Sequence, residues 1–184
     1  MPMVALCLNV AWEAYFSLFS PAALTNRVAY GVYLLADLGV LWTCVRFGPD
    51  DFESPLIRRF FRPLTALTLA GAFVAIRQFS LSFDDSFGGI SATFTTLALS
   101  VLLVGMLLRR NSVRGQSLPI ALSVLAGNIC GWVMNVIAHT TVQSNISLPW
   151  VHTTNALILL ANLIYIGLYC LVARRDRVGL WSRF

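Results

Sequence analysis

The sequence predicts an all-α membrane protein, a transmembrane bundle of about six helices in a single domain over residues 1–184. Hydrophobic residues make up 58% of the chain and charged residues only 11%, with a mean hydropathy of +0.75. A soluble domain carries about 25% charged residues, so the composition excludes a soluble globular protein. Crossing a bilayer takes about 20 predominantly apolar residues. The segments that qualify are 2–20, 27–46, 63–80, 88–108, 118–140 and 149–173.

The first two segments are separated by a short turn. Segment 2–20 carries Glu13 and stops at a Ser-Pro pair, which breaks a helix. It lacks the basic stretch that opens a signal peptide, so we expect it to be the first span of the mature protein. Segment 27–46 follows and ends just before a Gly-Pro pair.

The other four segments are also bounded by helix-breaking residues. Residues 47–62 contain a Ser-Pro pair and several charges, and we expect them to form a loop before 63–80. Segment 88–108 is followed by an Arg-Arg pair, and a proline stands at the start of both 118–140 and 149–173.

The arginines predict how the helices cross the membrane. All thirteen basic residues are arginines, and cytoplasmic loops carry an excess of basic residues. With six spans most of them fall on one side, which we expect to be cytoplasmic and to hold both termini. This placement accounts for the pI of about 9.4 without a nucleic-acid partner. The cytoplasmic set is Arg46, Arg58, Arg59, Arg62, Arg109, Arg110, Arg114, Arg174, Arg175, Arg177 and Arg183, against Arg27 and Arg77 outside.

The sequence predicts neither a metal site nor a cofactor. Its four cysteines lie in apolar segments, without a Cys-x-x-Cys pair or a histidine at metal-ligand spacing. The His-Glu-x-x-His and Gly-x-Ser-x-Gly motifs and a phosphate-binding glycine loop are missing. The pair Asp84-Asp85 lacks the helical repeat usual in magnesium–diphosphate sites, and we interpret it as part of a solvated outer loop.

Two acidic residues lie well inside predicted spans, Glu13 in the first and Asp37 in the second. A carboxylate in hydrocarbon is costly unless it is neutralised or paired, so such residues usually have a function. At 1.5 Å per residue both lie roughly 10 to 15 Å below the outer ends of their helices, and they could face a common cavity. Asn9 lies one turn before Glu13 on the same face, and Tyr33 precedes Asp37 at helical spacing.

An acid among aromatic side chains suggests carbocation chemistry. Desolvation favours the protonated form of a carboxyl, which makes it a proton donor, and aromatic faces stabilise cations. Trp12, Trp132 and Tyr165 place such rings within spans. The alternative is structural: a neutral, hydrogen-bonded Glu13 that locks the bundle, and asparagines such as Asn162 that join helices.

The stretch "NVAWEAYF" around Glu13 resembles the Asn-x-x-Trp-Glu motif of the small integral membrane terpene cyclases of fungal meroterpenoid and indole-diterpene pathways, which have bacterial relatives. The stretch "RVAYGVYLLADLGVLWTCVRFG" is similar to a second segment of that family, with an aspartate in mid-helix followed by a basic residue, an aromatic residue and a glycine. The loop "RRNSVRGQS" resembles the family's Arg-rich loop. The resemblance extends from residue 9 to about residue 165.

The resemblance implies that Glu13 is the general acid. We expect Asn9 to be its orienting partner and Asp37 either to assist proton transfer or to hold the network. The family's second essential acid, an aspartate in the last span, best matches Asn162 in "NLIY", and an amide cannot supply a proton. Family members typically have seven spans, so the resemblance leads us to expect one span fewer before the motif. We expect the substrate-binding wall to include Asn9, Trp12, Tyr33, Trp132, Asn162 and Tyr165.

The sequence therefore predicts a metal-independent terpene cyclase, of isomerase or lyase type, that protonates an epoxide or alkene of a prenylated or terpenoid substrate. Its partners would be that hydrophobic substrate and the lipid bilayer, with a prenyltransferase or epoxidase acting upstream in secondary metabolism. We expect a multi-pass protein of the bacterial plasma membrane. Two alternatives stay open, a non-catalytic relative that binds or transports a lipid or small hydrophobic molecule, and a structural membrane protein.

Overall fold

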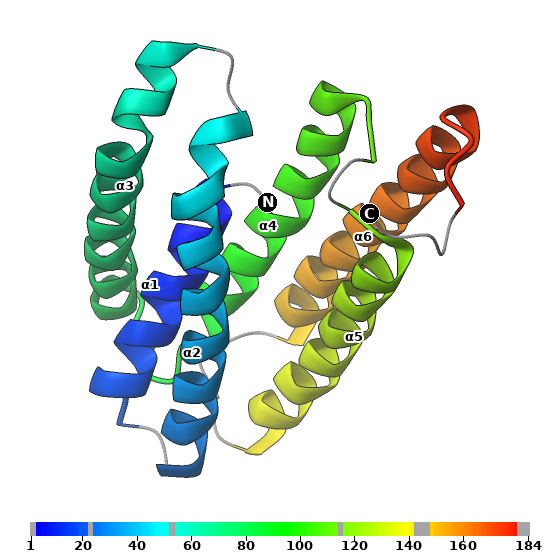
Figure 1. Cartoon of the computed structure of the whole chain (residues 1–184). Helices are drawn as coiled ribbons and strands as arrows, with labels where there is room; N and C mark the ends of the chain where they lie inside the picture. Colours follow the sequence, from blue (N-terminus) through cyan, green and yellow to red (C-terminus); the bar gives the residue numbers. More distant parts are fainter. Residues whose placement is uncertain (1–2, 22–23, 52–53, 114–115, 142–147, 180–184) are drawn as a thin grey trace. The chain divides into compact units, whose positions relative to one another are not determined.

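A computed structural model gives the fold and describes residues 3–21, 24–51, 54–113, 116–141 and 148–179. Within these ranges the chain forms six α-helices, one short 3₁₀ helix and no strand (Figure 1). The elements are α1 (Met3–Phe19), α2 (Leu24–Phe47), η1 (Gly48–Asp51), α3 (Pro55–Ser82), α4 (Gly89–Arg110), α5 (Leu118–Thr141) and α6 (Leu148–Arg175).

The helices confirm the prediction of a polytopic, all-α membrane protein. In the described part of the chain five helices, α2 to α6, are long and apolar enough to cross a membrane. α1 is apolar as well but has only 17 residues. The cytoplasmic position of both termini stays a prediction.

The chain packs into two compact units, an N-terminal unit of Met1–Thr95 and a C-terminal unit of Thr96–Phe184. The boundary falls within α4, so its first turns belong to the N-terminal unit. Each unit has its own cluster of buried apolar side chains. The single domain expected from the sequence stays a prediction.

In the N-terminal unit, α1 packs against both α2 and α3 (Figure 1). One face of α1 is therefore buried along its length, whereas almost all of α2 in its most apolar stretch is exposed on the surface of the unit. An outward apolar surface of this kind is what a lipid-facing helix requires. The buried cluster consists of Leu6, Cys7, Val10, Ala11 and Phe16 from α1, Leu41 from α2, and Ala72 and Ile76 from α3.

The prediction of a loop over residues 47–62 is wrong. α2 continues to Phe47, η1 follows, and α3 begins at Pro55, so that residues 55–62 are helical. Proline suits the first turn of a helix because its missing N–H would have no partner there, and Ser54 stands at the N-cap position. Hydropathy identifies only the apolar part of a helix. The arginines within residues 55–62 lower the hydropathy at the start of α3, so the sequence predicts a loop there.

Arg27 closes the C-terminal end of α1. Its Nε donates to the carbonyl oxygen of Ser17, and its Nη2 to that of Leu18, both at 3.0 Å. The last carbonyls of a helix have no partner within the helix, and an arginine at this end is also favoured by the helix dipole. Arg27 thus has a structural role at the junction of α1 and α2.

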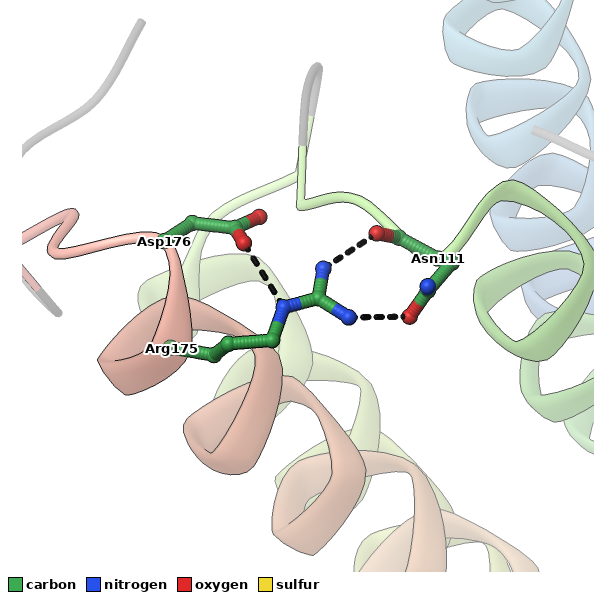
Figure 2. A network of polar contacts seen from close by, with 3 residues as sticks. All are labelled: Asn111, Arg175 and Asp176. Carbon is green, nitrogen blue, oxygen red and sulfur yellow. Dashed lines mark hydrogen bonds and ion pairs between the residues drawn. The ribbon is translucent and has the colours of Figure 1, made fainter.

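In the C-terminal unit, α5 packs against α6, and Arg175 joins the end of α6 to the end of α4 (Figure 2). Its Nη1 donates to Asn111 Oδ1 and its Nη2 to the Asn111 carbonyl oxygen, both at 2.6 Å, while Nε bonds Asp176 at 2.9 Å. Asn111 follows α4 with φ of +48°, a left-handed conformation that asparagine tolerates. The buried cluster of this unit is Leu107, Val113, Leu118, Ala121, Tyr165, Tyr169 and Ala173.

Candidate active site

An acidic cluster between α1 and α2 forms the centre of the candidate site. Glu13 lies in the middle of α1 with 8% of its surface exposed. Asp37 on α2 is close enough to interact with it electrostatically, and a side-chain hydrogen bond joins Asp37 to Asn9. The structure thus brings together the three polar residues that the sequence placed at similar depth.

The hydrogen bonding within this cluster differs from the expected one. We expected Asn9 to orient Glu13, but its side chain bonds Asp37 on the neighbouring helix. Glu13 Oε2 is buried and has no hydrogen-bond partner among the described residues. Buried polar atoms are nearly always paired, so an orphan carboxyl oxygen needs an explanation. It leaves a position at which a bound molecule can hydrogen-bond Glu13.

Trp12, the residue before Glu13, is held on several sides. Its ring centroid lies 4.9 Å from that of Phe16 and 4.9 Å from that of Tyr30, the latter in an edge-on arrangement. Its Nε1 donates to Ser91 Oγ at 2.9 Å. Gly88 has φ of +80° and leaves no room for a side chain, because a Cβ there would lie 2.8 Å from Trp12 Cζ2.

Asp85 corrects the interpretation of Asp84-Asp85 as a solvated loop. Asp84 is exposed, but Asp85 is completely buried. The Asp85 carboxylate accepts hydrogen bonds from the backbone N–H groups of Ile90 at 3.1 Å and Ser91 at 2.8 Å, and from Ser91 Oγ at 2.6 Å. It therefore satisfies the otherwise unpartnered donors at the start of α4, where negative charge is favoured.

Asp85 and Ser91 were not among the site residues predicted from the sequence. The signal that could have found Asp85 is the Gly-Gly pair that follows it and directly precedes the apolar run of α4. An acidic residue beside a helix start is a capping signal. Ser91 offers no such signal, because a serine within an apolar span is common.

Three of the predicted lining residues lie in the C-terminal unit, each with a polar partner. Asn162 is 1% exposed, and its Nδ2 donates to the Ile158 carbonyl oxygen at 2.8 Å and to Ser100 Oγ at 3.4 Å. Tyr165 Oη donates to Gln116 Oε1 at 3.0 Å, and Trp132 Nε1 donates to His152 Nδ1 at 3.1 Å. The part of these three residues in a site with Glu13 stays a prediction.

Tyr33 is the most exposed of the predicted site residues, with 61% of its surface accessible on α2. The N-terminal unit also contains a cleft of about 160 Å³ whose lining does not include the acidic cluster. The cleft is therefore separate from the candidate active site. It is lined by Tyr15, Phe19, Ser20, Pro21, Ser80, Leu81, Asp84 and Ser86.

The arrangement around Glu13 suits proton donation to an apolar molecule. A buried carboxyl can give up its proton to a bound group within hydrogen-bonding reach, and the rings of Trp12 and Tyr30 can stabilise positive charge. No group of three or more His, Cys, Asp or Glu side chains in the described ranges is placed to hold a metal ion.

Long apolar helices around a buried carboxyl define the class, a multi-pass membrane protein with an acidic site inside its helices. The model of the Pyr4-like transmembrane terpene cyclases matches residues 1–175, and the chain belongs to this family.

Fungal proteins of the same kind are similar to the chain. It is 32% identical over 135 residues to terpene cyclase nodB of Hypoxylon pulicicidum, covering 71% of this chain and 55% of nodB. It is 24% identical over 183 residues to the Pyr4-family terpene cyclase mfmH of Annulohypoxylon moriforme, covering 96% of this chain and 76% of mfmH. Terpene cyclase ptmB of Penicillium ochrochloron is 31% identical over 136 residues, with coverage of 71% and 55%. The chain thus spans about half the length of nodB and ptmB. No solved structure matches it.

Proposed function

We propose that the protein is a membrane-embedded terpene cyclase that starts ring closure by protonating an epoxide or alkene of a prenylated substrate. The observation that carries this proposal is the buried Glu13, whose Oε2 has no hydrogen-bond partner in the described part of the chain. Membership of the Pyr4-like family supports the same assignment. The names of the fungal relatives support it as well.

The reaction is an isomerisation. Glu13 gives its proton to the epoxide oxygen, the C–O bond at the more substituted carbon breaks, and a hydroxyl group and a carbocation result. Neighbouring double bonds then attack in turn, and each attack forms a C–C bond and moves the positive charge along the chain. The last cation loses a proton to the Glu13 carboxylate or to water. Atoms balance without a metal, an oxidant or a reductant.

The other residues of the cluster support this step. Trp12, the residue before Glu13 on α1, and Tyr30, whose ring it contacts, offer aromatic groups for stabilising positive charge. Asp37 assists proton transfer and keeps Asn9 in place through their hydrogen bond. The four further lining residues proposed for the substrate are Tyr33, Trp132, Asn162 and Tyr165.

A second function, binding or transport of a lipid or small hydrophobic molecule without catalysis, is favoured by one observation. At the place of the family's last-span acid stands Asn162, whose amide N–H groups are used by Ile158 and Ser100. A residue with this bonding stabilises the unit and supplies no proton.

A further proposal concerns the substrate, the membrane and the upstream enzymes. A terpenoid or prenylated aromatic substrate dissolved in the bilayer fits the apolar helices, and no nucleic acid takes part. An epoxide substrate requires a prenyltransferase and an epoxidase earlier in the pathway, and the genes beside this one test that.

The location in a bacterial plasma membrane is part of this proposal. The relatives named above are fungal, so a fungal membrane is the competing location, and fractionation of the source organism's cells decides between them.

The test of the cyclase function uses membranes that contain the full chain, supplied with epoxidised and plain prenyl-arenes and analysed by mass spectrometry. We expect an isomer of the substrate in the presence of the wild type. Glu13→Gln should abolish it while the variant stays folded in detergent. Asp84→Asn is the matched control, since it makes the same change at an exposed acid of the same unit, and it should keep full activity.

Two outcomes contradict the proposal. Full turnover by a folded Glu13→Gln variant removes Glu13 from the chemistry. Tight binding of the prenyl-arenes by a wild type that converts none of them supports the binding protein instead.

A further inference from the structure

We propose that Asp85 and Ser91 are positioning residues that fix the orientation of the Trp12 indole beside the general acid. This inference rests on the proposed cyclase function and adds residues that lie outside the Asn-x-x-Trp-Glu motif. The hydrogen bonds of Asp85 and Ser91 do not go to Glu13 in the described part of the chain, and both residues act through Trp12.

Asp85 is a fixed anchor. Its carboxylate is completely buried and accepts three hydrogen bonds, two of them from the backbone at the start of α4. Its own backbone is tied as well, because Ser80 Oγ donates to the Asp85 carbonyl oxygen at 3.0 Å. Hydrogen bonds to an ionised group are stronger than those between neutral groups. The carboxylate therefore has little freedom to move.

Ser91 transmits this fixed position to the tryptophan. Its hydroxyl donates to Asp85 at 2.6 Å and accepts from Trp12 Nε1 at 2.9 Å. A hydroxyl has a single hydrogen, and of its two acceptors the Asp85 carboxylate at 2.6 Å is closer than the Gly88 carbonyl oxygen at 3.3 Å, so we assign the hydrogen to Asp85 and the lone pairs to the indole N–H. The chain from Trp12 through Ser91 to Asp85 thus has one consistent direction of donation.

The orientation of the indole ring matters because of its neighbours. Trp12 directly precedes Glu13 on α1, and its ring meets Phe16 and Tyr30. An aromatic ring attracts a cation over its face but not at its edge. A hydrogen bond that fixes the Nε1 end of the indole would decide whether a cation near Glu13 meets the face or the edge of the ring. The orientation should therefore govern how far the cascade runs before the cation is lost.

The first measurement does not depend on catalysis. Ultraviolet resonance Raman difference spectra of the purified full chain, wild type minus Trp12→Phe, isolate the indole N–H band of Trp12. The band should show a strong hydrogen bond. In Ser91→Ala it should shift to the position of a free or weakly bonded N–H, and Ser91→Thr, which restores a hydroxyl, should return it toward the wild type.

The second measurement is the ratio of fully cyclised to early-terminated product. Ser91→Ala should lower this ratio roughly tenfold, with a smaller effect on the rate of substrate loss. In a Trp12→Phe background the same substitution should change nothing further. Thr93→Ala is the matched control, because the buried Thr93 hydroxyl of the same helix donates to the Gly89 carbonyl oxygen within α4 and not to Trp12.

An unchanged Trp12 band in Ser91→Ala, or an equal effect of Ser91→Ala with and without the indole, overturns the inference. Asp85→Asn removes the carboxylate that Ser91 bonds and should shift the Trp12 band in the same direction as Ser91→Ala, and if this variant fails to fold, Ser91→Ala alone carries the test. A wild type that forms no cyclised product from any substrate refutes the cyclase function, and a Raman shift in Ser91→Ala then still supports the positioning of Trp12.

Discussion

Asn9 on α1 and Asp37 on α2 are joined by a side-chain hydrogen bond one helical turn from Glu13. The bond links the two helices that carry the acidic cluster. It is also one contact, beside that of Trp12 with Tyr30, through which a substitution on α2 reaches the residues of the motif on α1.

The first prediction concerns the strength of this link. Asn9→Leu and Asp37→Leu should each lower the free energy of unfolding in mixed micelles by about 1–3 kcal/mol, since each leaves a polar partner without its bond. The double variant should lose about 1 kcal/mol less than the sum of the two. Asn26→Leu is the control for the cycle: it is exposed on the same helix and roughly 16 Å from Asp37 along the axis, so its effect should add to that of Asp37→Leu. Strict additivity for the first pair would contradict the bond.

The second prediction concerns Gly88. Gly88→Ala should destabilise the protein by about 1–3 kcal/mol, because alanine is strained in a left-handed conformation and its Cβ would lie 2.8 Å from the Trp12 ring. Gly71→Ala on α3 should have the opposite sign and stabilise by about 0.5–1 kcal/mol, because a Cβ there meets no atom within 4 Å. Thermal unfolding of both variants checks the two signs, and equal effects would show that the approach to Trp12 is unimportant.

The third prediction concerns Asn162. Asn162→Asp restores the carboxyl of the family motif, but an ionised aspartate cannot donate to Ile158 and Ser100 as the amide does. The variant should be less stable by about 1–3 kcal/mol, and its turnover should not exceed that of the wild type, because Glu13 supplies the proton. Product yield per folded protein is the measurement. A tenfold gain in turnover would mean that the chemistry needs a second acid in the last helix.

The fourth prediction concerns the contact in Figure 2. Arg175→Ala should lower the free energy of unfolding by about 0.5–1.5 kcal/mol, since it removes the bonds to Asn111. Arg175→Lys should recover little of this, because an ammonium group cannot form the two parallel bonds of a guanidinium. Arg174→Ala, at an exposed arginine beside it, should have almost no effect. Equal losses at positions 174 and 175 would assign the effect to general charge.

The sequence predicts the helices well and their ends less well. Apolar stretches longer than 17 residues are hard to mistake, and α4, α5 and α6 begin and end within two residues of the predicted segments. The start of α3 was missed because a helix that emerges from the apolar region no longer needs apolar residues, so Arg58, Arg59 and Arg62 look like a loop. A capping signal, here Ser54-Pro55, marks such an end better than hydropathy does.

The candidate site, too, could be predicted from the sequence only in part. Counting residues from the helix ends was enough to bring Glu13 and Asp37 to similar depth, since helical rise is nearly constant. The partner of Asn9 could not be predicted, because rotation about a helix axis decides whether a side chain faces its own helix or the next. The burial of Asp85 could not be predicted for a related reason. Which of two adjacent aspartates is buried depends on the conformation of the backbone between them, and Asp84 has φ of +50°.

The length of α1 gives the bilayer itself a place in this fold. Seventeen residues cover about 25 Å at 1.5 Å per residue, less than the roughly 30 Å of an average hydrocarbon core. The two bonds from Arg27 satisfy carbonyl oxygens at the end of this helix, which would be costly to leave unpaired in hydrocarbon. A thicker membrane would move this end deeper into hydrocarbon and draw the guanidinium with it. We therefore expect a change in membrane thickness to act first on Arg27, whose side chain bonds the end of the helix that carries Glu13.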